Sequence, residues 1–87
     1  MWTFEYTKKF IKQCGTYDSI EDPTIKDVLT QLATSDDPTK LGKYKKLMGV
    51  YAYEFGRSIR MLYNVRRKDN VIELIRFGDH KETYGKG

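Results

Sequence analysis

The 87-residue sequence is poor in the residue types that build covalent or metal-bound frameworks, with one cysteine, one histidine and two prolines. A single cysteine, Cys14, excludes an internal disulfide, and we expect it to be a small buried residue rather than a nucleophile. One histidine and one cysteine far apart cannot supply the usual zinc ligands, and no acidic cluster has calcium spacing. No metal site and no other cofactor is therefore predicted.

Long apolar runs are missing too, so no segment is predicted to span a membrane. The first residues, Met1–Tyr6, lack the basic start and apolar middle of a signal peptide. There is also no glycine-rich phosphate loop and no strand-turn-helix nucleophile elbow of the kind that serine hydrolases use. These absences favour a cytoplasmic protein whose chemistry, if any, needs neither a nucleotide loop nor a serine nucleophile.

Positive charge is plentiful and unevenly placed. Residues 1–39 contain four lysines against seven acidic residues, a balance of −3, whereas residues 40–87 contain twelve Lys or Arg against five acidic residues, a balance of +7. Such a split suggests one face that binds a polyanion and another that does not. The length predicts a single domain over residues 1–87.

The first 38 residues predict one strand and two helices. Residues 2–6 alternate aromatic and polar side chains, which is the period of a half-buried strand. Thr7 is expected to cap a first helix that ends at Gly15 and has one apolar side, formed by Phe10, Ile11 and Cys14. The second helix begins at Pro23, after the N-cap Asp22, and stops at residues 35–38. Its apolar positions recur at helical spacing: Ile25, Val28, Leu29 and Leu32.

After Gly49 the apolar period changes to two, which predicts strands over residues 50–55, 58–66 and 71–77. In the middle strand four residues face together: Ile59, Met61, Tyr63 and Val65. The basic segment 39–48 is compatible with a further helical turn or with an irregular arm. The order β-α-α-β-β-β predicts an α+β domain in which two N-terminal helices pack on one face of a small antiparallel sheet.

Two residues of the second half, His80 and Arg60, are candidate site residues. His80 follows the last strand, and an imidazole with a pKa of roughly 6.5 can transfer protons near neutrality, although a lone histidine can equally be an ordinary surface residue. Arg60 alternates with apolar residues, so its guanidinium either clamps a phosphate or pairs with an acid across the sheet. Such residues would be sufficient for the cleavage of RNA, because the substrate's own 2′-hydroxyl is the nucleophile and the protein supplies only an acid, a base and positive charge. A second proton-transfer group would come from Glu54, Tyr84, another tyrosine or a lysine.

With these elements in this order, the sequence resembles the RelE/ParE superfamily of toxins from toxin–antitoxin pairs. In the second half of the chain individual residues match the family, whereas in the first half only the order and spacing of the elements match. The matching segments are the basic arm Lys40–Lys46, Gly49, Arg60–Tyr63 and Gly78–Tyr84. It implies a RelE-like fold and a ribosome-dependent mRNA endoribonuclease that inhibits translation. Family members cut by 2′-hydroxyl attack without a metal, and they have a cognate antitoxin protein as partner.

The resemblance also implies roles for individual residues. Arg60 would stabilise charge on the reacting phosphate, His80 would protonate the leaving 5′-oxygen, and Tyr84 would stack on a base or share the proton transfer. Glu54 is the preferred base if the loop is Gly56–Ser58, because Glu54 then lies opposite Arg60. A two-residue turn would put Tyr53 there instead, since a one-residue slip changes faces. Further RNA contacts are expected from Lys43, Lys45, Lys46, Arg57 and Lys81.

Two other functions remain open at the level of sequence. A ParE-like toxin would bind DNA gyrase and cut nothing, while sharing the fold and the antitoxin partner. A basic RNA-binding module would have no activity. For the mRNA-cleaving toxin, the expected partners besides the antitoxin are the ribosome and mRNA. Binding to RNA or to the ribosome should weaken with salt, because lysines and arginines displace counterions from phosphates.

Overall fold

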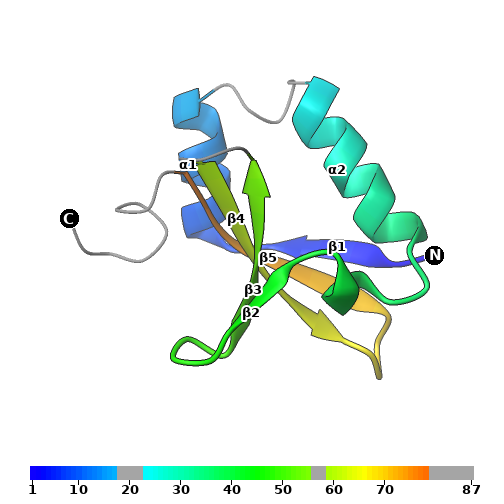
Figure 1. The fold of residues 1–87 in the computed structure, drawn as a ribbon. Helices are drawn as coiled ribbons and strands as arrows, with labels where there is room; N and C mark the ends of the chain where they lie inside the picture. Colours follow the sequence, from blue (N-terminus) through cyan, green and yellow to red (C-terminus); the bar gives the residue numbers. More distant parts are fainter. Residues whose placement is uncertain (18–22, 56–58, 79–87) are drawn as a thin grey trace.

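The structure, a computed structural model, describes residues 1–17, 23–55 and 59–78. Its elements are β1 (Thr3–Tyr6), α1 (Lys8–Tyr17), α2 (Pro23–Thr34), a 3₁₀ helix η2 (Pro38–Lys40), β2 (Lys43–Lys45), β3 (Val50–Phe55), β4 (Ile59–Arg66) and β5 (Val71–Gly78). The strands form one five-stranded sheet in the order β1-β5-β4-β3-β2, and both helices lie on the same side of it (Figure 1). The α+β class is therefore confirmed. Neither helix has the length and apolar character needed to cross a membrane within these ranges.

The sheet is mixed, so the prediction of an antiparallel sheet is wrong in one respect. Strands β2 to β5 pair antiparallel, but β1 pairs parallel with β5, from Thr3 opposite Val71 to Tyr6 opposite Leu74. The alternation in residues 2–6 reports which face each side chain takes. The alternation does not indicate which strand is the neighbour or in which direction that strand runs, because β1 pairs with β5, a strand near the other end of the chain.

The basic segment that the sequence left open contains both a short helix and a strand. Asp37 caps η2, since its carboxylate accepts a hydrogen bond from the Thr39 amide at 3.2 Å. Arg67 Nη2 lies 2.7 Å from Asp37 Oδ1, which ties η2 to the end of β4. The pKa of Asp37 is lowered, first by the hydrogen bond from the Thr39 side chain and then by that from Arg67. The segment then continues as β2 and turns into β3 at Gly49, whose φ of 68° suits glycine.

Helix α1 differs from its prediction at its end and on its apolar side. It continues through Gly15 to Tyr17, because one interior glycine costs only about 1 kcal/mol relative to alanine and does not end a helix by itself. Phe10 is buried as expected, but Ile11 is 59% exposed. The buried neighbour is instead Gln13, whose Oε1 accepts a hydrogen bond from the Phe77 amide at 2.8 Å. The Cys14 side chain and the predicted cap Asp22 lie outside the described residues.

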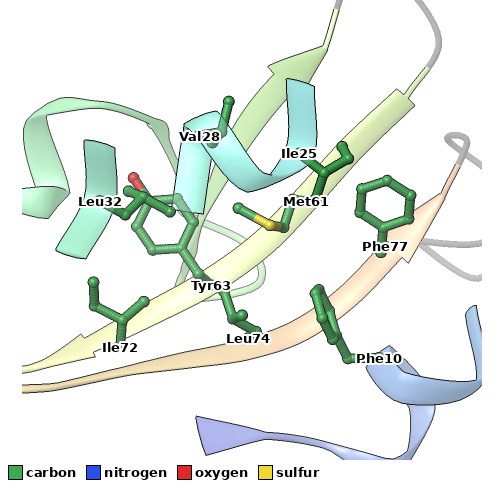
Figure 2. Packing of buried hydrophobic residues seen from close by; sticks show 9 residues of the cluster. All are labelled: Phe10, Ile25, Val28, Leu32, Met61, Tyr63, Ile72, Leu74 and Phe77. Atoms are coloured by element: carbon green, nitrogen blue, oxygen red, sulfur yellow. The ribbon is translucent and has the colours of Figure 1, made fainter. Parts of the chain in front are cut away.

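The hydrophobic core lies between the helices and the middle of the sheet (Figure 2). Helix α2 has the predicted bounds, and its expected stripe is buried except for Leu29, which is half-buried. The shared face predicted for four residues of β4 is confirmed, and it is the inner one, since Met61 and Tyr63 are fully buried and Ile59 and Val65 pack against the cluster. The buried members are Phe10, Ile25, Val28, Leu32, Met61, Tyr63, Ile72, Leu74 and Phe77.

Tyr63 joins this core to η2 through its hydroxyl group, which donates a hydrogen bond to the Pro38 carbonyl at 2.7 Å. Burial raises the pKa of Tyr63 far above its ordinary value, so the hydroxyl keeps its proton and remains a donor. Gly42 lies against the same hydroxyl, where an added Cβ would be 2.6 Å from the phenolic oxygen. Tyr63 therefore places the segment that leads into β2.

Replacing Tyr63 by phenylalanine should lower the free energy of unfolding by about 1–3 kcal/mol, because the buried Pro38 carbonyl loses its donor. Urea unfolding of the two proteins measures this difference. The matched control is Tyr44→Phe, since Tyr44 is 56% exposed and its loss should change the stability by less than about 0.5 kcal/mol. Equal effects of the two substitutions would contradict the assigned role of the Tyr63 hydroxyl.

Candidate functional site

The register of β3 and β4 brings the first two candidate residues together. Glu54 lies directly opposite Arg60, and Phe55 lies opposite Ile59. Strand β3 ends at Phe55 and β4 begins at Ile59, while residues 56–58 between them lie outside the described part. Of the two registers left open by the sequence, the structure therefore has the one in which Glu54 faces Arg60.

Glu54 sits between two cations from two neighbouring strands. Its Oε2 lies 3.5 Å from Arg60 Nε, and its Oε1 lies 3.7 Å from Lys43 Nζ. Lys43 comes from β2, where it pairs with Ala52, two residues before Glu54 on β3. The side chain of Arg60 is 19% exposed, against 31% for Glu54 and 74% for Lys43. Arg60 thus has the acidic cross-strand partner that one interpretation predicted.

A hollow of about 240 Å³ opens beside this group, so Glu54 can be approached by a ligand. Its wall includes the beginning of β2, which η2 and Tyr63 hold in place. The lining residues are Leu41, Gly42, Lys43, Ala52, Tyr53 and Glu54.

We call the sheet face opposite the helices the outer face. Residues that pair directly across neighbouring strands share a face, so Lys43, Glu54 and Arg60 lie on the outer face with Ala52 and Leu62. Ala52 and Leu62 are themselves buried. A carboxylate beside two cations at such a surface can bind a phosphate through the cations and accept a proton at the carboxylate.

Strand β5 adds a charged residue that the sequence analysis did not single out. Leu62 pairs with Arg76, but the next residue of β4, Tyr63, pairs with Leu74, so β5 contains one extra residue, Ile75. This β-bulge breaks the alternation of side chains and puts Arg76 on the outer face with Leu62. Strict alternation from Ile72 and Leu74 would have put Arg76 in the core. The signal for the bulge is present in the sequence, because Phe77 is apolar at the wrong spacing from Leu74.

The bulge is held by the beginning of the chain. The Thr7 hydroxyl donates a hydrogen bond to the Ile75 carbonyl at 2.6 Å, and the Thr7 amide donates one to the Leu74 carbonyl at 3.1 Å. On the other side of Arg76, the Phe77 amide donates to the Gln13 side chain. The backbone around Arg76 therefore has partners on both sides, as buried peptide groups require.

The remaining candidates are placed only in part. Lys45 lies on the outer face opposite Val50, and Lys46 is exposed in the turn between β2 and β3. The described segments contain no group of three or more His, Cys, Asp or Glu residues that could hold a metal ion. The structure therefore brings together Lys43, Glu54 and Arg60. Four predicted site residues lie outside the described residues: Arg57, His80, Lys81 and Tyr84.

No protein-family model and no curated protein sequence matches the chain, whereas several solved structures are similar to it in fold. A metal-bound toxin from Helicobacter pylori has 23% identity, with 94% of this chain and 98% of that chain covered and a TM-score of 0.75. The toxin–antitoxin complex RelBE from E. coli matches with 18% identity, 91% and 96% coverage and a TM-score of 0.74. YafQ from E. coli matches with 15% identity, 98% and 100% coverage and a TM-score of 0.70. The chain thus has the fold of RelE-like toxins, as the resemblance implied.

Proposed function

We propose that this chain is the toxin of a toxin–antitoxin pair, a single RelE-like domain that cleaves mRNA on the ribosome. The observation that carries the proposal is Glu54 opposite Arg60, with Lys43 on the other side of the carboxylate, at a surface that a ligand can reach. The fold shared with proteins described as toxins supports the same function. The positive balance of residues 40–87 supports a polyanionic substrate.

In the proposed reaction, the RNA 2′-hydroxyl attacks the adjacent phosphate and the bond from that phosphate to the 5′-oxygen breaks. Glu54 takes the proton of the 2′-hydroxyl, and His80 gives a proton to the leaving 5′-oxygen. Arg60 neutralises the charge that develops on the phosphate oxygens, for which a guanidinium fork is well suited. Tyr84 stacks on a base or shares the proton transfer. The products are a 2′,3′-cyclic phosphate and a 5′-hydroxyl end.

The proposed partners follow from the charge of the outer face and from the relatives. Lys43, Lys45 and Lys46, together with Arg57 and Lys81, would contact the RNA backbone and make binding sensitive to salt. The RelBE structure from E. coli contains a toxin–antitoxin complex, and we propose a cognate antitoxin for this chain as well. Such an antitoxin would cover the basic face or displace the C-terminal residues. A toxin that acts on ribosomes would work in the cytoplasm.

The test is a purified translation system in which the ends of ribosome-bound mRNA are mapped. The wild-type protein should produce new 5′-hydroxyl ends, since these follow from 2′-hydroxyl attack, and His80→Ala should slow their appearance by about 10²–10⁴-fold. If mRNA stays intact in the presence of the wild-type protein, the proposed nuclease function is wrong.

A cross-strand ion pair can also stabilise a sheet without any catalysis, which keeps a ParE-like toxin as the second candidate. Such a toxin would inhibit DNA supercoiling by gyrase and leave mRNA intact. A supercoiling assay with the same protein preparation distinguishes the two, and binding of RNA without either activity would indicate the inactive RNA-binding module.

A further inference from the structure

The outer face has its excess positive charge at one end. Near the end of β3, its described residues include three cations and one acid: Lys43, Arg60, Arg76 and Glu54. Toward the other end of the same strands, the face has two cations and two acids: Lys45, Arg66, Glu5 and Glu73. Of these, Arg66 and Glu5 form an ion pair. An anionic ligand is therefore attracted to the end that contains Arg60 and Arg76.

Arg76 is the diagonal neighbour of Arg60 across β4 and β5. Arg60 pairs with Gly78 and Leu62 pairs with Arg76, so the two arginines are separated by one diagonal step of the sheet, about 7–8 Å. Gly78 has no side chain, so nothing from β5 stands directly opposite Arg60 on this face. Arg76 is half-buried, which limits the freedom of its long side chain while leaving part of it reachable.

A second arginine matters here because Arg60 already faces an acid. The Glu54 carboxylate offsets part of the charge of Arg60 and Lys43, and it also repels an approaching phosphate. Arg76 adds a further cation next to this group. An arginine presents a planar fork that binds phosphate oxygens in pairs.

We propose that Arg76 is a second phosphate-binding residue of the site, which holds the RNA backbone beside the phosphate bound by Arg60. The inference rests on the proposed function and specifies how the substrate is held. The bulge at Ile75 directs Arg76 to the outer face, and Thr7 and Gln13 hold the strand on either side of it. Bulges serve in this way elsewhere, where they redirect a side chain next to a site.

The test compares Arg76→Ala with Arg66→Ala, a control on the same face at its neutral end. The probe is a single-stranded RNA whose 2′-hydroxyls are methylated, so that it binds but cannot be cut. Arg76→Ala should weaken binding about tenfold and reduce the slope of log affinity against log salt by about 0.7, the value for one phosphate contact on a single strand. Arg76→Lys should keep the slope and recover part of the affinity. Arg66→Ala should stay within about twofold of the wild type, because its partners are acidic residues of the protein.

Cleavage on the ribosome and thermal unfolding are measured with the same variants, and Arg76→Gln replaces the alanine variant if alanine lowers the melting temperature. If Arg76→Ala binds RNA, responds to salt and cleaves mRNA as the wild type does, the inference is wrong and the nuclease function stands. If Arg76→Ala binds RNA more weakly but the wild type does not cleave mRNA, the inference is supported and the nuclease function is wrong. If the wild type does not bind the RNA at all, the inference fails, and cleavage on the ribosome decides the nuclease function separately.

Discussion

Replacing Arg60 by alanine should slow mRNA cleavage by about 10²–10³-fold, the usual cost of removing one preorganised donor from a site that stabilises developing charge. The Arg60 side chain is only 19% exposed, lies opposite Glu54, the proposed base, and has Gly78 opposite it on β5. This position suits the proposed role, in which Arg60 neutralises charge that develops on the phosphate. Single-turnover cleavage of ribosome-bound mRNA measures the effect.

Two variants make this result specific. Arg60→Lys keeps the positive charge but loses the fork, so its rate should lie between those of the wild type and the alanine variant. Arg66→Ala removes an arginine from the same strand and the same face, and it should cleave at nearly the wild-type rate. Folding should be little changed in Arg60→Ala, since partly exposed ion pairs contribute about 0–1 kcal/mol. Rapid cleavage by Arg60→Ala would contradict the proposed role.

Replacing Glu54 by glutamine should slow cleavage by about 10²–10⁴-fold, the range expected when a positioned proton acceptor is lost. The amide has nearly the same shape but does not accept the proton. Binding of the methylated RNA should be unchanged or tighter, because a negative charge beside the phosphate site has been removed. This combination of slower cleavage with preserved binding distinguishes a base from a residue that merely holds the site together.

The control for Glu54→Gln is Glu73→Gln, an acid of β5 at the neutral end of the outer face. It should leave both cleavage and binding as they are. Cleavage by Glu54→Gln at the wild-type rate would show that Glu54 serves only as an ion-pair partner of Arg60 and Lys43. A double-mutant cycle of Glu54 and Arg60 would then report the energy of that pair in folding.

Local patterns were sufficient for much of the fold. Pro23 and the apolar stripe predict the bounds and the buried face of α2, because a helix of twelve residues repeats its spacing several times. The alternation after Gly49 predicts β3 and the residues of β4 that share a face in the same way. Gly15 misled the prediction for α1, because glycine weakens a helix by an amount that packing of Phe10 and Gln13 can offset.

The candidate site was predictable only in its components. By itself the sequence indicated a basic, strand-rich second half with Arg60 on a sheet face and Glu54 or Tyr53 as its neighbour. Tertiary structure decided that Glu54 faces Arg60, that β2 brings Lys43 to the carboxylate, and that β1 runs parallel to β5.

It also decided that a bulge puts Arg76 beside Arg60, and the hydrogen bonds that hold this bulge come from residues 68 and 64 positions earlier in the chain. A periodic pattern reports the face that a side chain takes as long as the period is unbroken. Register and strand direction depend on hydrogen bonds between distant segments, which no local pattern contains. The spacing of Phe77 signals a bulge, but the distant residues that hold it are not part of that pattern.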